Sequence, residues 1–426
     1  MRWIVALGAA VAVGLATPAG GAVAQAAAPP AYPAGSPAGR AAARDAAARS
    51  VTAPQDASVR KAYRFLNQMM DLYAAGTVPR LVQSYTGGLL GREHFTESVT
   101  YDDALVIDAY LAKGTAAAVA RAEVVGNGLR YVQVHDPRHD GRIRAGYAPV
   151  PLTSPGMITA TDKTSDAGNM AWAGLALAQL YGASGRKTYL AGAEAVGNWV
   201  QAHCRDTRGP GGYTEGTAAD GTAMEWKSTQ HNIVLYALFT MLAAETGDRA
   251  WSARAAWARR FVAAMWDGPQ HRFYVGTTAD GYTPNNSQLP EDVNSWSYLA
   301  LRDPAYASSL GWDVRNLAVT DGPFHGVSFC RGDRTGVWFE GTAHLADALE
   351  LSGTAAARAQ AVTYLSGIRY AQASGPNSDG LGIIAASKNG LSDCHGGYYY
   401  ASLHTGATAW YILAATRTDP FTPVKG

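Results

Sequence analysis

Apolar residues recur along this chain with the period of an α-helix. In three segments, 104–111, 171–181 and 233–242, they cover almost every side of the expected helix. A helix with that pattern is packed on several sides, so these segments predict an inner layer. More amphipathic segments lie between and after them and predict an outer layer; they span 115–134, 187–203, 249–266, 305–318 and 354–373.

The predicted inner helices begin at polar and aromatic residues that repeat along the chain. Their starts lie about 63–65 residues apart, with one shorter interval of about 46, near Asp103, Asp166, Gln230, Asn294, Glu340 and Thr405. A repeat of this length with two helices in each unit predicts stacked helical hairpins. Six hairpins can close into a ring, so the expected fold is all-α: an (α/α)6 barrel, closed by a helix at 58–74 against one at 405–417. The inner helix starts would then face one central cavity.

The connections between the predicted helices are of two kinds. Turns from an inner to an outer helix are short, as at 113–115. Connections from an outer to an inner helix are long and combine glycine with aromatic residues, as at 211–213 and 273–276. We expect short β-hairpins in these long connections. Because long loops often carry binding and catalytic residues, the functional site is expected on the rim that they form.

The N-terminal part of the chain differs in composition from the rest. Residues 1–26 contain a basic residue, an apolar run and a small-residue exit, which predicts a Sec-type signal peptide and a secreted protein. The run is short for a membrane-spanning helix, so no stable membrane anchor is expected. Residues 27–57 are rich in alanine and proline and lack helical periodicity, which indicates a flexible linker. The predicted catalytic domain spans 58–426.

The composition narrows the class of ligand. The chain of 426 residues has a formal net charge of +1, and 16% of its residues are charged. Because no basic stripe stands out, nucleic acid and anionic membrane surfaces are not expected partners. The 11 Trp and 22 Tyr residues offer many flat side-chain faces. Aromatic residues in this number suit a neutral, ring-shaped ligand.

The chain has three cysteines. An exported protein meets an oxidising environment, which favours one disulfide and one free thiol. Cys330 and Cys394 lie in glycine-rich connections and are the expected pair. Cys204 ends an apolar helical segment and is expected to be buried.

Carboxylate residues recur at the predicted inner helix starts. Asp102, Asp166 and Asp292 have a simple structural explanation, since aspartate is a preferred helix cap and favours the first turn of a helix. Glu340 is harder to explain as a cap, because two aromatic residues at 338–339 precede it and would desolvate its carboxyl group. We expect this burial to raise the pKa of Glu340.

Glu225 lies in a similar setting, between Met224 and Trp226. Several carboxyl groups among aromatic residues around one cavity indicate glycoside hydrolysis. That reaction uses two carboxyl groups across a sugar, one protonated and one ionised. Aromatic side chains that could bind the faces of a sugar occur on the same rim: Trp226, Trp296, Trp338 and the tyrosines at 398–400.

Four sequence patterns carry a resemblance to a known superfamily. They are YDDAL at 101–105, AWAGLAL at 171–177, STQHNIVLYALF at 228–239 and WFEGTAHLADAL at 338–349. Together they resemble the six-hairpin glycosidase superfamily of secreted bacterial carbohydrate enzymes, over most of 58–417. The superfamily contains hydrolases, phosphorylases and lyases, so the resemblance is more informative about the fold than about the reaction.

The resemblance implies a glycosidase that inverts the anomeric centre, with a glutamic acid as proton donor and an aspartate as base. We match Glu340 to the acid and Asp103 to the base, and keep Glu225 as the next candidate acid. Residues expected to bind the carbohydrate substrate are Asp102, Asp166, Trp226, His231, Asn232, Asp292, Trp296, Trp338, Tyr399 and His404. A monomer without cofactor or metal is expected.

Three alternatives remain open on the same sequence. A polysaccharide lyase would use tyrosine or histidine as base, from His231, His404 or the tyrosines at 398–400, with Asn232 neutralising a uronate; the acidic rim would repel such a substrate. A zinc enzyme would use Cys330 and the Cys-His-Gly element at 394–396, which resembles that of lanthionine cyclases. A non-catalytic toroid would bind sugars through its aromatic residues alone.

Overall fold

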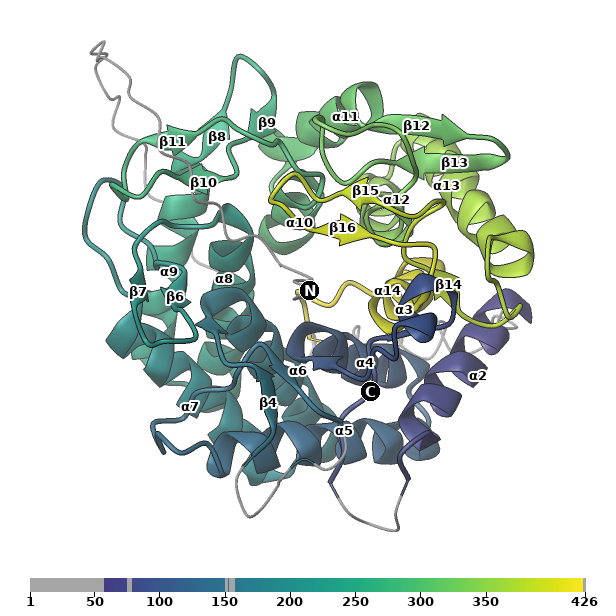
Figure 1. Cartoon of the computed structure of the whole chain (residues 1–426). Helices are drawn as coiled ribbons and strands as arrows, with labels where there is room; N and C mark the ends of the chain where they lie inside the picture. The colour runs from purple at the N-terminus through teal and green to yellow at the C-terminus, as the bar shows by residue number, and fades with distance from the viewer. Residues whose placement is uncertain (1–56, 75–78, 150–151, 153–157, 424–426) are drawn as a thin grey trace, which may run out of the picture.

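The computed structural model describes residues 57–74, 79–149, 152 and 158–423. The predicted signal peptide, and the predicted linker except its last residue, lie outside this part of the chain. In the described part, the fold is all-α, an (α/α)6 barrel, which confirms the predicted fold class (Figure 1).

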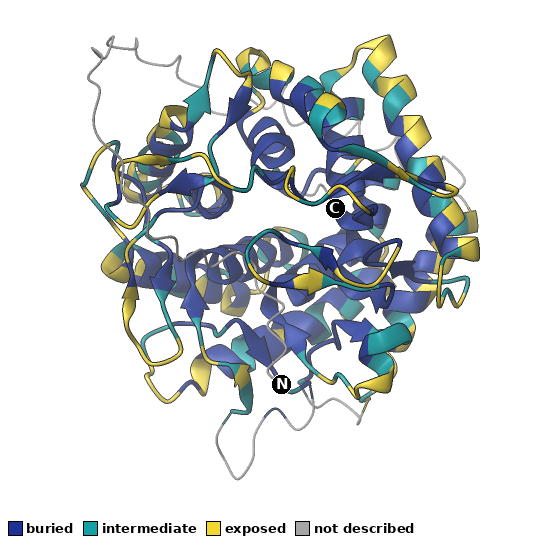
Figure 2. Ribbon diagram, turned by 45° about the horizontal axis from the view of Figure 1, so that its top comes forward, coloured by how far each residue is buried: buried dark blue, intermediate teal, exposed yellow. Residues whose placement is uncertain are grey.

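Six inner helices form a closed ring. They are α4 (Thr100–Lys113), α6 (Ala167–Ser184), α8 (Thr229–Thr246), α10 (Asp292–Leu301), α12 (Phe339–Ser352) and α14 (Thr405–Thr416). Each contacts the next along the chain, and α14 contacts α4, which completes the ring. The inner helices are buried on almost every side, as their apolar sequences predicted (Figure 2).

The outer helices surround this ring. They are α2 (Ala57–Asp71), α5 (Ala116–Val134), α7 (Lys187–His203), α9 (Arg249–Ala264), α11 (Ala307–Asn316) and α13 (Ala355–Ser374). The helix α2 packs against α14, so the first described helix pairs with the last one. The remaining helical segments are short: α3 (Gly88–Arg92) and the 3-10 helix η1 (Pro304–Tyr306).

The turns from inner to outer helices share a local design. Four inner helices end at a glycine in the left-handed conformation, where a side chain would be strained: Gly114, Gly185, Gly247 and Gly353. In three of these turns an N-cap side chain then accepts a backbone hydrogen bond and starts the outer helix: Thr115, Asp248 and Thr354. These turns form the short-loop end of the barrel.

The long connections form the opposite end and contain short antiparallel strands, as predicted. Three-stranded groups are β2 (Ser98–Val99), β3 (Gly146–Tyr147) and β4 (Ala160–Asp162), and β5 (Ser165–Asp166), β6 (Gly216–Thr217) and β7 (Ala223–Met224). Two-stranded pairs are β8 (Trp266–Asp267) with β9 (Arg272–Phe273), β10 (Gly276–Thr277) with β11 (Pro284–Asn285), β12 (Ala318–Asp321) with β13 (Phe324–Val327), and β15 (Leu391–Ser392) with β16 (Tyr398–Tyr399).

A last sheet joins the two ends of the described chain. The strand β17 (Leu403–His404) lies between β1 (Tyr85–Thr86) and β14 (Ile383–Ile384). Its register places Tyr85 opposite His404. The ring is therefore closed by strand pairing on the long-loop rim as well as by helix packing.

The disulfide between Cys330 and Cys394 is present, and Cys204 is a buried free thiol, as predicted. The zinc alternative is wrong in the form considered, because the disulfide occupies both of its proposed thiolate ligands. Among the described helices, none combines the length and apolar character needed to cross a membrane.

Candidate active site

A pocket opens at the long-loop end of the ring, among the N-termini of the inner helices. It encloses about 430 Å³, including the part that opens to solvent. The lining residues are Tyr85, Val99, Tyr101, Asp102, Asp292, Trp296, Phe329, Trp338, Glu340, His344, Tyr399 and His404.

Glu340, in the first turn of α12, is the most highly connected carboxylate of the pocket. Its Oε1 accepts a hydrogen bond of 2.6 Å from the Tyr101 hydroxyl and lies 3.7 Å from Nε2 of His344. Its Oε2 lies 3.3 Å from Nδ1 of His404. Burial alone would raise the pKa of Glu340, but the two neighbouring imidazoles and the Tyr101 hydroxyl together lower it.

The expectation that its aromatic neighbours raise the pKa of Glu340 is therefore wrong. The carboxyl group is desolvated as expected. However, His344 and His404 stabilise its ionised form, and their effect exceeds that of burial. The carboxyl group of Glu340 is thus ionised rather than protonated.

His404, immediately before α14, lies between two carboxylates. Its Nε2 is 3.3 Å from Oδ2 of Asp102, and its Nδ1 faces Glu340. The imidazole stacks on Tyr85 with parallel rings 4.1 Å apart. Burial lowers the pKa of His404, but the charges of Asp102 and Glu340 raise it overall. Both carboxylates therefore stabilise the positively charged form of the ring, while Nδ1 also lies within 3.3 Å of the Ala407 backbone N–H.

His344 lies one helical turn after Glu340 and connects it to a deeper carboxylate. Its Nδ1 is 3.1 Å from Oε2 of Glu291, and both side chains are fully buried. Burial lowers the pKa of His344, but Glu291 and Glu340 raise it overall to about 9. His344 is therefore protonated at neutral pH. Carboxylates and imidazoles alternate from Glu291 through Glu340 to Asp102.

Asp292, the first residue of α10, behaves in the opposite way to Glu340. Burial, together with the charge of Glu291, raises the pKa of Asp292 to about 6, against the lowering effect of a hydrogen bond with Gln230. Within the described part of the chain, its Oδ1 is buried and has no hydrogen-bond partner. Asp292 can therefore hold a proton in a pocket where Glu340 is ionised.

Aromatic side chains form much of the pocket wall. Trp338 packs against Phe329 with ring centroids 4.7 Å apart and against Tyr399 at 5.5 Å. Trp296 and Tyr101 line the deeper part, with ring centroids 6.2 Å apart. Flat apolar faces beside charged groups suit a sugar, which presents both C–H faces and hydroxyl groups.

The structure brings seven of the predicted site residues to this pocket: Asp102, Asp292, Trp296, Trp338, Glu340, Tyr399 and His404. Sequence reasoning did not select Tyr85, Val99, Tyr101, Phe329 or His344. The i, i+4 spacing of Glu340 and His344 was a usable signal, because residues four apart share a helix face. No sequence signal pointed to Tyr85, which reaches the site through the pairing of β1 with β17.

Asp103 does not line the pocket, so the pocket gives no support to its predicted role as base. Its oxygens accept hydrogen bonds of 2.8 Å from the Val82 backbone and the Ser98 hydroxyl. Burial, with the charge of Asp102, raises the pKa of Asp103 well above its usual value. One step along a helix turns the side chain by about 100°, so Asp102 faces the cavity and Asp103 faces the loop before α4.

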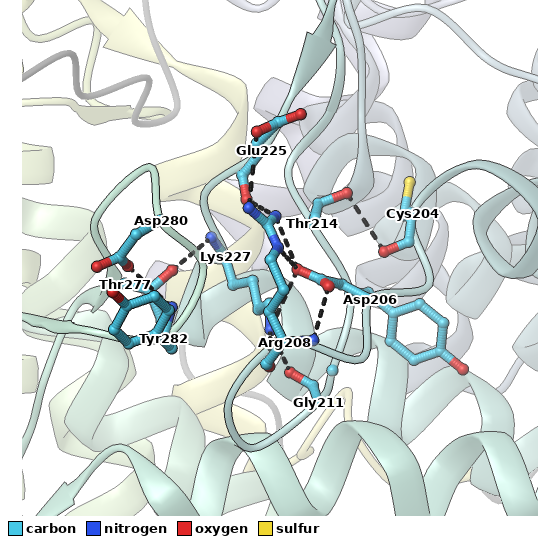
Figure 3. A network of polar contacts seen from close by, with 12 residues as sticks. Cys204, Asp206, Arg208, Gly211, Thr214, Glu225, Lys227, Thr277, Asp280 and Tyr282 are labelled. Atoms are coloured by element: carbon cyan, nitrogen blue, oxygen red, sulfur yellow. Dashed lines mark hydrogen bonds and ion pairs between the residues drawn. The ribbon is translucent and has the colours of Figure 1, made fainter.

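Glu225 lies on the surface outside the pocket, with 67% of its side chain exposed, so its position does not support it as a candidate acid. Figure 3 shows it beside Arg208, in a polar network with Asp206 and Lys227. Trp226 follows it in the chain and is half-buried outside the pocket. The aromatic neighbours of Glu225 in sequence therefore do not desolvate it.

Three further predicted binding residues also lie outside the pocket lining. Asp166 caps α6 by accepting hydrogen bonds from the backbone and side chain of Asn169. The Asn232 side chain accepts a hydrogen bond from the Tyr213 backbone N–H and donates one to the Tyr213 carbonyl oxygen. His231 is buried against Glu215, with Nδ1 and Oε2 2.9 Å apart. His231 and Asn232, which the lyase alternative would use, therefore both bind other residues of the protein.

Comparison with known proteins finds solved structures with the same fold. No model of a protein family matches the sequence, and no curated protein is significantly similar to it. A cellobiose 2-epimerase from Bacillus thermoamylovorans superposes with a TM-score of 0.63 at 9% identity, covering 84% of this chain and 97% of that chain. A family 76 glycoside hydrolase (mannosidase) from Bacteroides thetaiotaomicron gives 0.59 at 10% identity, with coverages of 86% and 98%.

A D-mannose isomerase superposes with a TM-score of 0.60 at 12% identity, covering 86% of this chain and 98% of that chain. These structures and the present chain share the (α/α)6 toroid fold. At such low identities the similarity shows the fold alone.

Proposed function

We propose that the protein is a carbohydrate-active enzyme and, within that class, a glycoside hydrolase. The proposal depends on Asp292 and Glu340, two carboxyl groups of one pocket whose environments shift the pKa in opposite directions. Glycoside hydrolysis needs one carboxyl group that carries a proton and one that is ionised. The names of the three compared structures, all enzymes of sugars, support the substrate class.

The roles follow from the charge states. Asp292 donates a proton to the oxygen of the leaving group. Glu340 is the ionised partner, which activates water or attacks the anomeric carbon directly. The proposal thus replaces the assignment made from sequence, in which Glu340 was the acid. Inversion remains a prediction, and the configuration of the first product decides it.

The remaining polar groups support this chemistry. His344 and His404 contact Glu340 from two sides, which fixes its orientation as well as its charge. Asp102 lines the pocket on the far side of His404 and is available to bind sugar hydroxyl groups. The aromatic residues of the wall pack against the apolar faces of the sugar and keep water out.

An epimerase or isomerase is the second candidate, because two imidazoles line the pocket and two of the compared structures have such activities. These reactions need a base that removes a proton next to a carbonyl group. With a pKa of about 9, His344 is already protonated at neutral pH, and the pKa of His404 is raised as well. A protonated imidazole is a poor base, which argues against His344 in that role and favours hydrolysis.

A substrate screen tests the proposal. The purified protein is incubated with plant, fungal and bacterial polysaccharides, and separately with free mannose and cellobiose. New reducing ends that disappear in Asp292→Asn and Glu340→Gln, but persist in the surface variant Glu225→Gln, support hydrolysis. Conversion of the free sugars without new reducing ends would instead identify an isomerase or epimerase. New ultraviolet absorbance from a C=C bond would identify a lyase.

We also propose that the enzyme acts outside the cell. The predicted signal peptide and the disulfide support this location, since disulfides persist in oxidising compartments. Mass spectrometry of protein recovered from culture medium tests it: a mature N-terminus near residue 27 is the expected result. Intact chains confined to the cytoplasm would contradict it.

A further inference from the structure

We infer that the pocket accepts one terminal sugar residue, so that the enzyme removes sugars from chain ends instead of cutting inside a polysaccharide. This inference rests on the proposed hydrolase function. An enzyme that cuts internally must let the polymer pass on both sides of the bound sugar. In this protein, aromatic side chains fill the ring behind the pocket, and a hairpin of the long-loop rim contributes to its wall.

Aromatic side chains close the inner end. Tyr101 and Trp296 line the pocket, and Trp410 lies behind them, donating a hydrogen bond of 2.7 Å from Nε1 to the Tyr101 hydroxyl. Phe421 then packs against Trp172 at 5.2 Å and Trp296 at 5.8 Å between ring centroids. The centre of the ring is therefore filled, and a polymer cannot thread through it.

The segment that carries Phe421 is held firmly in this position. Gln179 donates hydrogen bonds of 2.9 Å from Nε2 to the carbonyl oxygens of Pro420 and Thr422. Arg302 forms an ion pair with Asp419, which is almost fully buried. Contacts from α6 and from the residue that follows α10 thus hold the segment against the aromatic side chains behind the pocket.

Tyr399 contributes to the pocket wall from the long-loop rim. It lies on β16 of the β15–β16 hairpin, which crosses the inner ring near α10 and α12 in Figure 1. On one side its ring packs against Phe329 at 5.6 Å and Trp338 at 5.5 Å. On the other side it packs against the cluster that contains Tyr85. Tyr399 therefore packs against two separate hydrophobic clusters of the rim.

The hairpin is tied to its neighbours. Cys394, between its strands, forms the disulfide with Cys330, which follows Phe329 in the chain. The Ser392 backbone donates a hydrogen bond of 2.9 Å to Oδ2 of Asp333. The hairpin and the segment that carries Phe329 are thus joined by one covalent and one polar contact, so Tyr399 is held in place over the pocket.

The reacting groups are correspondingly deep. Asp292 and Glu340 are only 2% and 3% exposed, and Asp102 of the same pocket is 1% exposed. A linear polymer lying across the surface cannot bring an internal linkage to carboxyl groups at that depth. A chain end can insert one ring between the aromatic walls, with the rest of the chain leaving through the mouth.

Product analysis tests the inference on any polysaccharide that the screen shows to be hydrolysed, labelled at its reducing ends with a fluorophore. The expected result is one small sugar as the first product, while the labelled polymer shortens slowly. A ladder of labelled fragments of intermediate length at early times would overturn the inference but leave the hydrolase function intact. Absence of hydrolysis on every substrate would overturn both.

A pair of variants tests the role of the hairpin. Tyr399→Ala should widen the mouth, producing intermediate fragments and raising KM by about tenfold as one aromatic wall is lost. Tyr398→Ala is the matched control, because Tyr398 points to the opposite face of the strand, is 53% exposed and does not line the pocket. Unchanged products and KM in Tyr399→Ala would show that the hairpin does not limit access.

Discussion

Nδ1 of His404 lies 3.3 Å from Oε2 of Glu340, although the two residues begin different inner helices. The contact explains why a carboxyl group that is almost completely buried remains ionised. Burial favours its neutral form, whereas an adjacent positive imidazole favours its charged form. In Glu340 the second effect is larger, because His344 adds to that of His404.

Replacing His404 should therefore change the pH dependence of catalysis. In His404→Gln the carboxylate of Glu340 loses one stabilising charge, so its pKa rises and a higher pH is needed to ionise it. The acid limb of the kcat/KM profile should move to higher pH. A profile that shifts only in height would mean that His404 positions substrate without affecting the charge of Glu340.

Asp292 should limit activity on the alkaline side. The pKa of Asp292 is about 6, and a general acid must be protonated to act. As pH rises above 6 the protonated fraction falls, so kcat/KM should decrease by about tenfold per unit. The pH profile of the wild-type enzyme measures this limb. An alkaline limb that stays in place in Asp292→Asn would assign it to another group.

The Asp292→Asn variant itself should lose a factor of roughly 10² or more in turnover on natural glycosides. The loss should be much smaller on aryl glycosides with acidic leaving groups, because such groups depart without protonation. Glu340→Gln should show no such rescue, since its role is independent of the leaving group. Equal losses on both substrate types in Asp292→Asn would argue against its role as the acid.

The sequence predicted the ring because its signals are local and repeated. Helical periodicity, glycines at the ends of inner helices and the repeat length are all properties of neighbouring residues. Whether Asp102 or Asp103 faces the cavity depends instead on the rotation of α4 about its own axis. A rotation that corresponds to one residue would exchange the two side chains. The charge of Glu340 depends on His404, which only the closure of the ring brings near it.

The same dependence on long-range contacts explains why other predicted residues lie outside the pocket. Glu225 and Trp226 lie in a segment with the polar and aromatic residues that are typical of a sugar site. However, the connection that carries them lies at the surface, with Glu225 beside Arg208. His231 follows the same polar pattern and is buried against Glu215. A pattern of residue types identifies the rim on which a site lies. The pocket itself is defined by contacts between distant segments, such as that of Tyr85 with His404.

The His344–Glu291 pair should make stability depend on pH. The pKa of His344 is raised from 6.5 to about 9 in the folded protein. Its contribution is therefore fully present below about pH 6.5 and is lost as pH rises through about 9. Urea midpoints should fall over this interval in the wild type and less in His344→Gln. The exposed variant His135→Gln is the control, and an equal fall in all three proteins would assign the effect to other groups.

The disulfide between Cys330 and Cys394 should contribute both stability and access control. It closes a long loop, with a sequence separation of 64. Constraint of the unfolded chain by such a loop is expected to stabilise the fold by about 2–4 kcal/mol. Cys330→Ser with Cys394→Ser should lower the denaturation midpoint accordingly. Because Cys204 is buried, the native wild-type protein should react with a thiol reagent only after unfolding, and then at a single cysteine.

The effect of losing the disulfide on catalysis shows whether it controls access to the pocket or has a purely structural role. Loss of the bridge frees the hairpin that carries Tyr399, so KM should rise and intermediate fragments should appear, as in Tyr399→Ala. The turnover number should change less, because neither Asp292 nor Glu340 belongs to the bridged segments. Cys204→Ser is the control for loss of a thiol elsewhere. If the double variant loses stability but keeps its KM and product pattern, the bridge stabilises the fold without restricting access to the pocket.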